Sequence, residues 1–429
     1  MAASVPDRPS WGRRTAAKLW RYRREIAVGV VVAATAGVPL CVPAGRRRLG
    51  AALRHARTRR GLVAAFTELR LANSQGQMPR IRRVEETAFG QRVHLRARAG
   101  HWFELLEVRA PVLAAATRSM AVRVERDPND ASRIALDVVR CDPLARVGDV
   151  EWLSVDDGAL SMWDPIHLGT TEGGVPLWTS LVERSVLVGG MPRSGKSNFL
   201  RIIATHAAKS PDVEMLLIDP NRVQFSPWRD RALAFADNDP VAACAVLEQV
   251  AVEIDRRLDL LTTLPGVPDK VTPEIGREYG MPPWLLMIDE LAYHTATAGT
   301  SASRARFAGL LRDIVARGQA ALIIAVVATQ RPTDKIVPRD LGDLFSIRVA
   351  FSVMSGGNSD VILGDGWAKR GFNAGDIGLD SAGTAYLLAD GGKPVKFKAA
   401  RIPADVIADL AVTTPVNKPG ARRLRSVAA

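Results

Sequence analysis

The sequence predicts an α/β fold with a parallel sheet and helices on both of its faces. Two observations lead to this fold class. From about residue 165 onward, short β-branched runs alternate with stretches that carry apolar residues at helical spacing. One such run, "SVLVGG" (185–190), passes through a glycine turn into the helical pattern "NFLRIIATHAA" (198–208). A strand, a tight loop and a helix in this order are the setting of a phosphate-binding loop.

The loop between them, "GMPRSGKS" (190–197), fits the pattern G-x-x-x-x-G-K-[ST] at every fixed position. Its backbone N–H groups would surround the phosphates of a nucleotide. Lys196 would reach the β- and γ-phosphates, and the Ser197 hydroxyl would bind Mg²⁺. ATP and Mg²⁺ are therefore the expected ligands. The residues expected to bind the nucleotide are Gly190, Met191, Pro192, Arg193, Ser194, Gly195, Lys196, Ser197 and Asn198.

A second apolar run, "WLLMIDE" (284–290), ends in two carboxylates. This is the pattern of a buried parallel strand whose C-terminal end faces a ligand. Asp289 is placed to hold Mg²⁺ through water, and Glu290 is placed to polarise the attacking water. Taken alone, such a run is more often a strand entering a solvated loop. Its position after a phosphate loop favours an ATPase-type site.

A third run, "ALIIAVVATQ" (321–330), ends in the polar residues Thr329, Gln330 and Arg331, a pattern that suits a sensor of the γ-phosphate. The alternative is an ordinary strand that ends in a loop. The remaining elements expected in this part of the chain are strands at 213–220 and 346–351 and helices over 241–262 and 303–317.

The positive charge of the chain is concentrated at its N-terminus. The 429 residues carry a formal net charge of +13, and residues 1–60 contain fourteen Lys or Arg against two acidic residues. The remainder is nearly neutral, so the overall basicity does not by itself indicate nucleic acid. Three scattered cysteines and six histidines without metal-ligand spacing argue against disulfides and zinc.

These basic residues flank "IAVGVVVAATAGVPLCVPAG" (26–45), twenty residues without a charge. As a helix, they would span roughly 30 Å, the thickness of the hydrocarbon layer. A buried core helix and a cleaved signal peptide are the alternatives, but the flanking arginines and the long charged leader favour a single transmembrane helix. Both flanks are basic, so the charge bias cancels. The need for ATP then places the C-terminal part in the cytoplasm of a single-pass protein of the cell membrane, with lipid as a partner.

The segment between this span and the phosphate loop contains a second, smaller folding pattern. A strand at 80–89, a helix over 101–120 and a hairpin over 121–139 indicate a small α+β domain suited to packing or assembly. The expected organisation is a basic leader (1–25), a transmembrane helix (26–45), a basic helical connector (46–79), the small domain (80–150), the P-loop domain (165–405) and a flexible basic tail (406–429).

Several stretches together resemble the FtsK/SpoIIIE-type DNA motor domains in order and spacing. They are "LLIDPNRVQFSPW" (216–228), "LLMIDE" (285–290), "VVATQRPTDKIVP" (326–338) and "LGDLFSIRVAF" (341–351). Two further stretches, "SDVILGDGWAKRGFNAGDI" (359–377) and "AYLLADGGKPVKFKAA" (385–400), look closer to the actinobacterial Tra (TraB/TraSA-like) branch, whose members transfer conjugative plasmids and integrative elements. The resemblance covers about residues 165–405.

The resemblance implies a RecA-like motor that assembles as a ring, usually a hexamer, around double-stranded DNA. Lys196 would bind nucleotide, Asp289 and Glu290 would serve the metal and the water, and Gln330 would report the γ-phosphate. Ring motors complete each site with an arginine from the neighbouring subunit. Arg317, with Arg312 as a second candidate, would supply it, and DNA would be contacted by Lys335 and Arg339 in the loop after the sensor strand.

Two departures from the family pattern affect these expectations. The family often has Gly-Arg-Ala-Ala before the sensor strand, where this chain has "GQAA" (318–321), so the arginine supplied in trans is uncertain. The family also commonly ends in a winged-helix module, and the 29 residues after the last expected strand are too few for one. The expected function is a membrane-anchored, ATP-driven translocase of double-stranded DNA that serves conjugative transfer, together with other transfer proteins. A type VII-like protein-secretion ATPase, a chromosome-partitioning DNA pump and a non-enzymatic membrane platform remain as alternatives.

Overall fold

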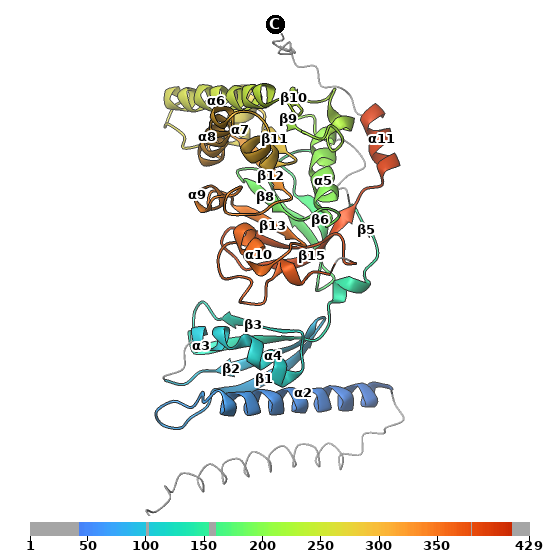
Figure 1. Ribbon diagram of the computed structural model, residues 1–429, viewed down its shortest axis with the longest axis vertical. Helices are drawn as coiled ribbons and strands as arrows, with labels where there is room; N and C mark the ends of the chain where they lie inside the picture. The colour runs from blue at the N-terminus through green and yellow to red at the C-terminus, as the bar shows by residue number, and fades with distance from the viewer. Residues whose placement is uncertain (1–42, 100–102, 154–159, 379, 414–429) are drawn as a thin grey trace, which may run out of the picture. The chain divides into compact units, whose positions relative to one another are not determined.

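The structure is a computed structural model that describes residues 43–99, 103–153, 160–378 and 380–413 (Figure 1). The chain divides into two compact units, one up to Arg140 and one from Cys141 onward. The uncharged stretch 26–45 lies outside the described residues except for its last three positions, which belong to the first helix. Within the described ranges, no helix is both long enough and apolar enough to cross a membrane.

The first unit is a four-stranded antiparallel sheet in the order β1-β2-β4-β3, with helices packed on one face. Alternate residues of the strands point to this face, so that Val93, Leu95 and Leu136 form one core with Leu62 and Phe66 of the first helix. The elements are α2 (Pro43–Glu68), β1 (Arg80–Thr87), β2 (Gly90–Arg96), α3 (Phe103–Val108), α4 (Ala110–Thr117), β3 (Ala121–Arg126) and β4 (Arg133–Val139).

Two features of this unit differ from the sequence-based expectation. The helix expected in the connector over 46–79 is present as α2, but it packs against α4 and belongs to the core of this unit. The single helix expected over 101–120 is two short helices, α3 and α4. The break falls just before Pro111, which sits in the first turn of α4, because proline lacks the N–H that a continuous helix would need there.

The second unit is built on an eleven-stranded sheet in the order β10-β9-β11-β12-β8-β13-β14-β15-β6-β7, with β5 also paired to β15. Its strands are β5 (Val150–Glu151), β6 (Ile166–Thr171), β7 (Pro176–Thr179), β8 (Val186–Gly189), β9 (Glu214–Ile218), β10 (Ala234–Ala236), β11 (Trp284–Ile288), β12 (Ile323–Thr329), β13 (Ile347–Phe351), β14 (Thr384–Ala389) and β15 (Val395–Arg401). Its main helices are α5 (Lys196–Lys209), α6 (Pro240–Thr263), α7 (Pro273–Glu278), α8 (Ser301–Arg317), α9 (Arg339–Gly342), α10 (Gly356–Leu363) and α11 (Ala404–Thr413).

Helices cover both faces of this sheet, as the sequence predicted. Alternate residues of the central strands divide between two cores: Met215 and Leu217 pack on the side of α5, whereas Leu216 and Ile218 pack on the side of α6 and α8. All four side chains are fully buried. A strand that is covered on both faces must be apolar at every position, which explains the uninterrupted apolar runs in the sequence.

The expectation of a wholly parallel sheet is wrong. The strands from β10 to β13 are parallel neighbours, but β13 pairs antiparallel with β14, β14 with β15, β15 with β6 and β6 with β7. Two of these pairs follow from the length of the connections, because β14 joins β15 and β6 joins β7 through short turns that can only link antiparallel strands. The sheet is therefore mixed, with its parallel half around β8.

Candidate nucleotide site

The phosphate loop leaves β8, which lies between β12 and β13 in the middle of the sheet. Two backbone hydrogen bonds attach the loop to the ends of these neighbours. The N–H of Gly190 donates to the carbonyl of Thr329 at 3.2 Å, and the N–H of Met191 donates to the carbonyl of Ser352 at 2.9 Å. The loop therefore stands at the carboxyl edge of the parallel strands, where open α/β sheets bind their ligands.

The backbone of the loop is shaped for close approach to an anion. Gly195 has a φ of 112°, and a Cβ at this position would lie 2.6 Å from the Cα of Gly383. Arg193 also adopts a left-handed φ of 66°, a strained conformation for a residue with a side chain, and such strain collects at ligand clamps.

The donors around the loop also fit a bound phosphate. Helix α5 begins at Lys196 without a capping side chain, so its first N–H groups have no capping acceptor and can meet phosphate oxygens. The hydroxyl of Ser194 is buried and has no hydrogen-bond partner within the described part of the chain. A phosphate chain would supply the missing acceptors, so the residues present fit a nucleotide.

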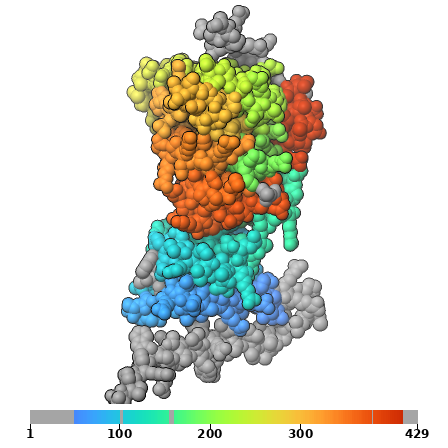
Figure 2. Space-filling model, in the orientation of Figure 1, coloured from blue at the N-terminus to red at the C-terminus, as the bar shows by residue number. Residues whose placement is uncertain are grey.

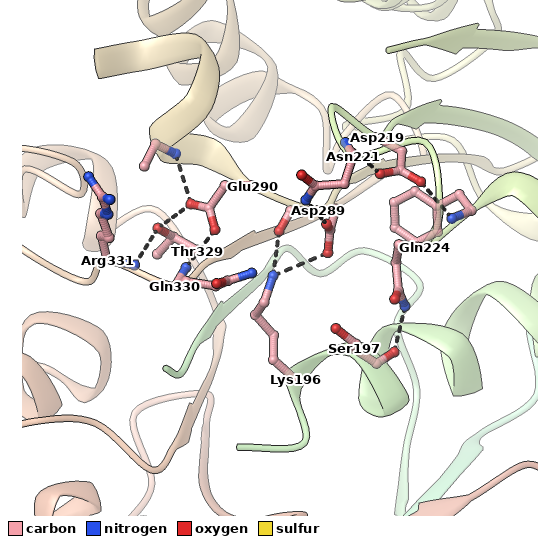
Figure 3. A network of polar contacts seen from close by, with 12 residues as sticks. Lys196, Ser197, Asp219, Asn221, Gln224, Asp289, Glu290, Thr329, Gln330 and Arg331 are labelled. Atoms are coloured by element: carbon pink, nitrogen blue, oxygen red, sulfur yellow. Dashed lines mark hydrogen bonds and ion pairs between the residues drawn. The ribbon is translucent and has the colours of Figure 1, made fainter. Parts of the chain in front are cut away.

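Lys196 and Asp289 meet at the centre of the site (Figure 3). The Lys196 side chain, only 3% exposed, donates from Nζ to the Asp289 carbonyl at 2.6 Å and to its Oδ1 at 3.1 Å. The other carboxylate oxygen of Asp289 lies 3.4 Å from the side-chain nitrogen of Asn221. The sequence prediction that these two motifs share one site agrees with this geometry. Ser197, the other residue expected at the metal, is exposed on the first turn of α5.

Glu290 is held by three hydrogen bonds. Its Oε1 accepts from the Thr329 hydroxyl at 2.8 Å and from the Ala292 N–H at 3.1 Å, and its Oε2 accepts from the Gln330 N–H at 2.8 Å. The Thr329 hydroxyl in turn accepts from the N–H of Arg331 at 3.1 Å. The end of β12 thus positions the carboxylate that follows β11, and the side chain of Gln330 points toward Lys196 in Figure 3.

Three further polar residues line the site beside Asp289, and the sequence did not lead us to expect them there. They are Asp219, Asn221 and Gln224. Asp219 follows β9, is fully buried, and accepts from the N–H groups of Asn221 at 3.1 Å and Phe225 at 2.9 Å. Burial raises the pKa of Asp219, and the neighbouring Asp289 raises it further. Gln224 donates to the carbonyl of Ser197 at 2.5 Å. The signal was present in the sequence, since "LLIDPNRVQ" (216–224) ends an apolar run in an aspartate just as "LLMIDE" does.

The side chains of the other expected residues point elsewhere. The Asn198 amide donates to the carbonyl of Ala400 in β15, so only its backbone remains available to a nucleotide. Arg317 is committed within its own chain: its Nε donates to Asp313 at 2.6 Å and its Nη1 to Asp255 at 2.6 Å. These carboxylates raise the pKa of Arg317 above its usual range.

The two residues expected at DNA lie in the segment after β12. Lys335 is exposed and has no recorded partner among the residues that the structure describes. Arg339 begins α9 and pairs with Asp365, while Arg312 pairs with Asp340 at 2.7 Å. No cluster of three or more His, Cys, Asp or Glu able to hold a metal occurs among the described residues.

Comparisons with known proteins agree with this site. Residues 162–265, which contain the phosphate loop, match the FtsK/SpoIIIE family. The DNA translocase FtsK of Staphylococcus aureus is 30% identical over 227 residues, which is 49% of this chain and 28% of the relative. The DNA translocase SpoIIIE of Bacillus subtilis is 27% identical over 316 residues, 69% of this chain and 38% of the relative. The chain thus spans roughly a third of the length of these curated relatives.

Solved structures show the same fold. The monomer of the pCW3 conjugation coupling protein TcpA with ATPγS superposes with a TM-score of 0.55 at 18% identity, covering 83% of this chain and 98% of that one. The cytoplasmic domain of the type VII secretion ATPase EccC of Thermomonospora curvata superposes with a TM-score of 0.51 at 19% identity. The match covers 66% of this chain and 34% of that one. The chain therefore has a P-loop ATPase-like fold, and the resemblance to the FtsK/SpoIIIE family seen in its sequence is matched over residues 162–265.

Proposed function

We propose that this chain is an ATP-driven translocase of double-stranded DNA. The observation that carries the proposal is the meeting of Lys196, Asp289 and Glu290 at the carboxyl ends of β8 and β11, two parallel strands that flank β12. This arrangement brings together a lysine for the phosphates, a carboxylate for the metal and a second carboxylate for the attacking water. The curated relatives aligned over this domain bear the name DNA translocase, which supports DNA as the cargo.

Each residue of the site has a proposed task in hydrolysis. Lys196 exchanges its contact with Asp289 for the β- and γ-phosphates of ATP, to which it presents a point charge. Ser197 and Asp289 hold Mg²⁺, which supplies charge neutralisation at the phosphates. Glu290 orients the attacking water and accepts its proton, while the Gln330 side chain contacts the γ-phosphate.

The biological setting that we propose is conjugative transfer from the cell membrane. The match covers 98% of the coupling protein TcpA but only 34% of the EccC chain. The proposal includes a membrane helix over 26–45, a cytoplasmic motor and a homo-oligomeric ring, usually hexameric in such motors. It also includes an arginine supplied by the neighbouring subunit. Arg317 can serve only if the ring releases it from Asp313 and Asp255.

The test is ATP hydrolysis by the full chain with and without duplex DNA. A translocase should hydrolyse ATP faster when duplex DNA of any sequence is present, and it should displace a triplex-forming strand from that DNA. A rate of ATP hydrolysis that is the same with and without duplex DNA would instead favour the protein-secretion alternative. Glu290→Gln is the matched control, since it should still bind ATP while losing both activities.

A further inference from the structure

Helix α2 presents an exposed stripe on the side away from its own core. Leu49, Leu53, Arg57 and Arg60 follow one another at spacings of four, four and three residues, which places them on one face of a helix. We call these four residues the α2 stripe. The helix lies at the surface of the first unit in the space-filling view, in blue (Figure 2). The residues that face the core instead are Thr58, Leu62, Ala65 and Phe66.

The α2 stripe combines exposed apolar and unpaired basic side chains. Leu49 is 38% exposed and Leu53 is 44% exposed. Arg57 and Arg60 are also exposed, and neither has a recorded hydrogen-bond or ion-pair partner among the described residues. Arg54, beside the stripe, differs because its Nε lies 3.2 Å from a carboxylate oxygen of Glu86. The helix as a whole contains seven arginines and one acidic residue, so its charge is not neutralised along its own length.

We propose that the α2 stripe binds an anionic membrane surface, with Arg57 and Arg60 on lipid phosphates and the two leucines in the interface. A helix lying at such a surface requires basic and apolar residues on one face. The position in the chain supports this occupant, because α2 begins at Pro43, directly at the end of the uncharged stretch 26–45. The inference thus rests on the proposed membrane attachment. Duplex DNA would engage the arginines but would leave both leucines in water.

The experiment places an environment-sensitive nitrobenzoxadiazole probe on the stripe. The probe is attached to the Leu53→Cys variant of the full chain, in which Cys41 and Cys141 are replaced by serine and the buried Cys244 is kept. We expect blue-shifted emission and quenching by brominated lipid when the membranes contain phosphatidylglycerol, but not when they are pure phosphatidylcholine. High salt should reverse the response, because exposed charges are screened.

Charge variants then test the two arginines. Arg57→Gln with Arg60→Gln should shift the equilibrium between lipid-bound and free α2 by about thirtyfold, since each basic residue near an anionic surface is worth about 1 kcal/mol. Arg80→Gln with Arg126→Gln is the matched control, because both arginines are exposed, lie outside α2 and have no recorded partner in the described ranges. This control should respond like the parent chain, and ATP hydrolysis without DNA should be the same in all variants.

Three outcomes decide the matter. A phosphatidylglycerol response that is lost only in the Arg57/Arg60 variant supports the inference. The inference is overturned if the probe never responds although the chain stays in phosphatidylcholine membranes after a salt wash. In that case the proposed membrane helix still stands. If the Arg57/Arg60 variant loses duplex DNA affinity and keeps its lipid response, the stripe is a nucleic-acid surface and the inference fails.

Discussion

The ammonium of Lys196 lies 2.6 Å from the backbone carbonyl of Asp289 and 3.1 Å from its carboxylate. The lysine of the phosphate loop is thus already neutralised by the acid expected at the metal. A buried lysine cannot remain without a partner, because an uncompensated charge in the interior is costly. Under the proposed function, nucleotide binding would exchange the partners of Lys196, so that the phosphates replace Asp289 and release its carboxylate.

The first prediction separates binding from turnover. Lys196→Ala removes the charge that would meet the phosphates and leaves Asp289 buried without its partner, so ATP affinity should fall at least tenfold. Glu290→Gln keeps the shape of the site but cannot accept a proton, so ATP should bind normally while kcat falls at least a hundredfold. Equilibrium binding of a fluorescent ATP analogue and steady-state hydrolysis measure the two effects. Unchanged turnover in Glu290→Gln would remove this residue from the mechanism.

The second prediction concerns Thr329, whose hydroxyl donates to Glu290 at 2.8 Å. Thr329→Val keeps the volume and removes this donor, and a hydrogen bond to a charged group is worth about 1.5–3 kcal/mol. We expect kcat to fall about tenfold or more with little change in KM, because the carboxylate loses one of the three hydrogen bonds that position it. Thr329→Ser retains the hydroxyl and should stay close to the parent. Equal kcat values in the valine and serine variants would contradict this role.

The third prediction addresses the DNA contacts proposed at Lys335 and Arg339. If each binds a phosphate, replacing both by alanine should reduce the slope of log affinity against log salt by about 0.9 per lost phosphate contact. DNA stimulation should disappear while basal hydrolysis persists. Asp365→Asn is an informative companion, because it frees Arg339 from its present ion pair and should strengthen DNA binding. An unchanged salt slope in the double variant would place the contacts elsewhere.

The fourth prediction follows from His294, which is buried and stacks on Phe307 with ring centroids 5.1 Å apart. Burial lowers the pKa of His294 to about 4, although Asp237 and Asp239 oppose this shift. In the unfolded chain, His294 takes up a proton near pH 6.5. The contribution of the neutral, buried His294 to the free energy of unfolding is therefore fully present above that pH. It is lost as the pH falls toward 4, by at most about 3 kcal/mol. His294→Phe should remove this part of the acid sensitivity. Thermal unfolding of the parent and of the His294→Phe variant at pH 7.5 and pH 5 measures this effect. An equal fall in melting temperature in the two proteins would contradict the prediction.

The fifth prediction compares two truncations at the N-terminus. Removal of residues 1–42 keeps α2 whole, so the first unit should fold and the protein should no longer require detergent. Removal of residues 1–60 deletes Thr58, which hydrogen bonds to Gln91, and uncovers Leu62 and Phe66. That variant should expose apolar surface, bind a hydrophobic dye and precipitate. Equal solubility and equal melting of the two proteins would mean that α2 does not stabilise this unit.

The parts of the site that the sequence could predict are those that follow local patterns. The phosphate loop needs only a strand, a glycine turn and a helix, and the apolar run before Asp289 marks its strand as buried on both faces. The contact between Lys196 and Asp289 could be expected because both lie at carboxyl ends of parallel strands. The assignment of Asp219 was missed, although its run is similar, since no pattern says which strands become neighbours.

The antiparallel half of the sheet was missed for a different reason. Its signal was a turn: "ADGGKP" (389–394) carries left-handed backbone at Asp390 and Gly391, which is typical of hairpins. The ion pairs of Arg317 could not be fully predicted from the sequence either. Asp313 can be foreseen one helical turn away, but Asp255 lies on α6, and only the packing of α6 against α8 brings it within 2.6 Å.

The pairing of β5 and β6 with β15 determines where the P-loop domain can be cut. These early strands cover the outer edge of β15, one against residues 400–401 and the other against 397–399. A fragment that starts at residue 180 would contain the whole phosphate loop and still leave Val395–Arg401 as an open edge, ready to pair with another chain and aggregate. The candidate nucleotide-site motifs lie between residues 190 and 330, but a fragment that contains every strand of this sheet must run at least from Val150 to Arg401.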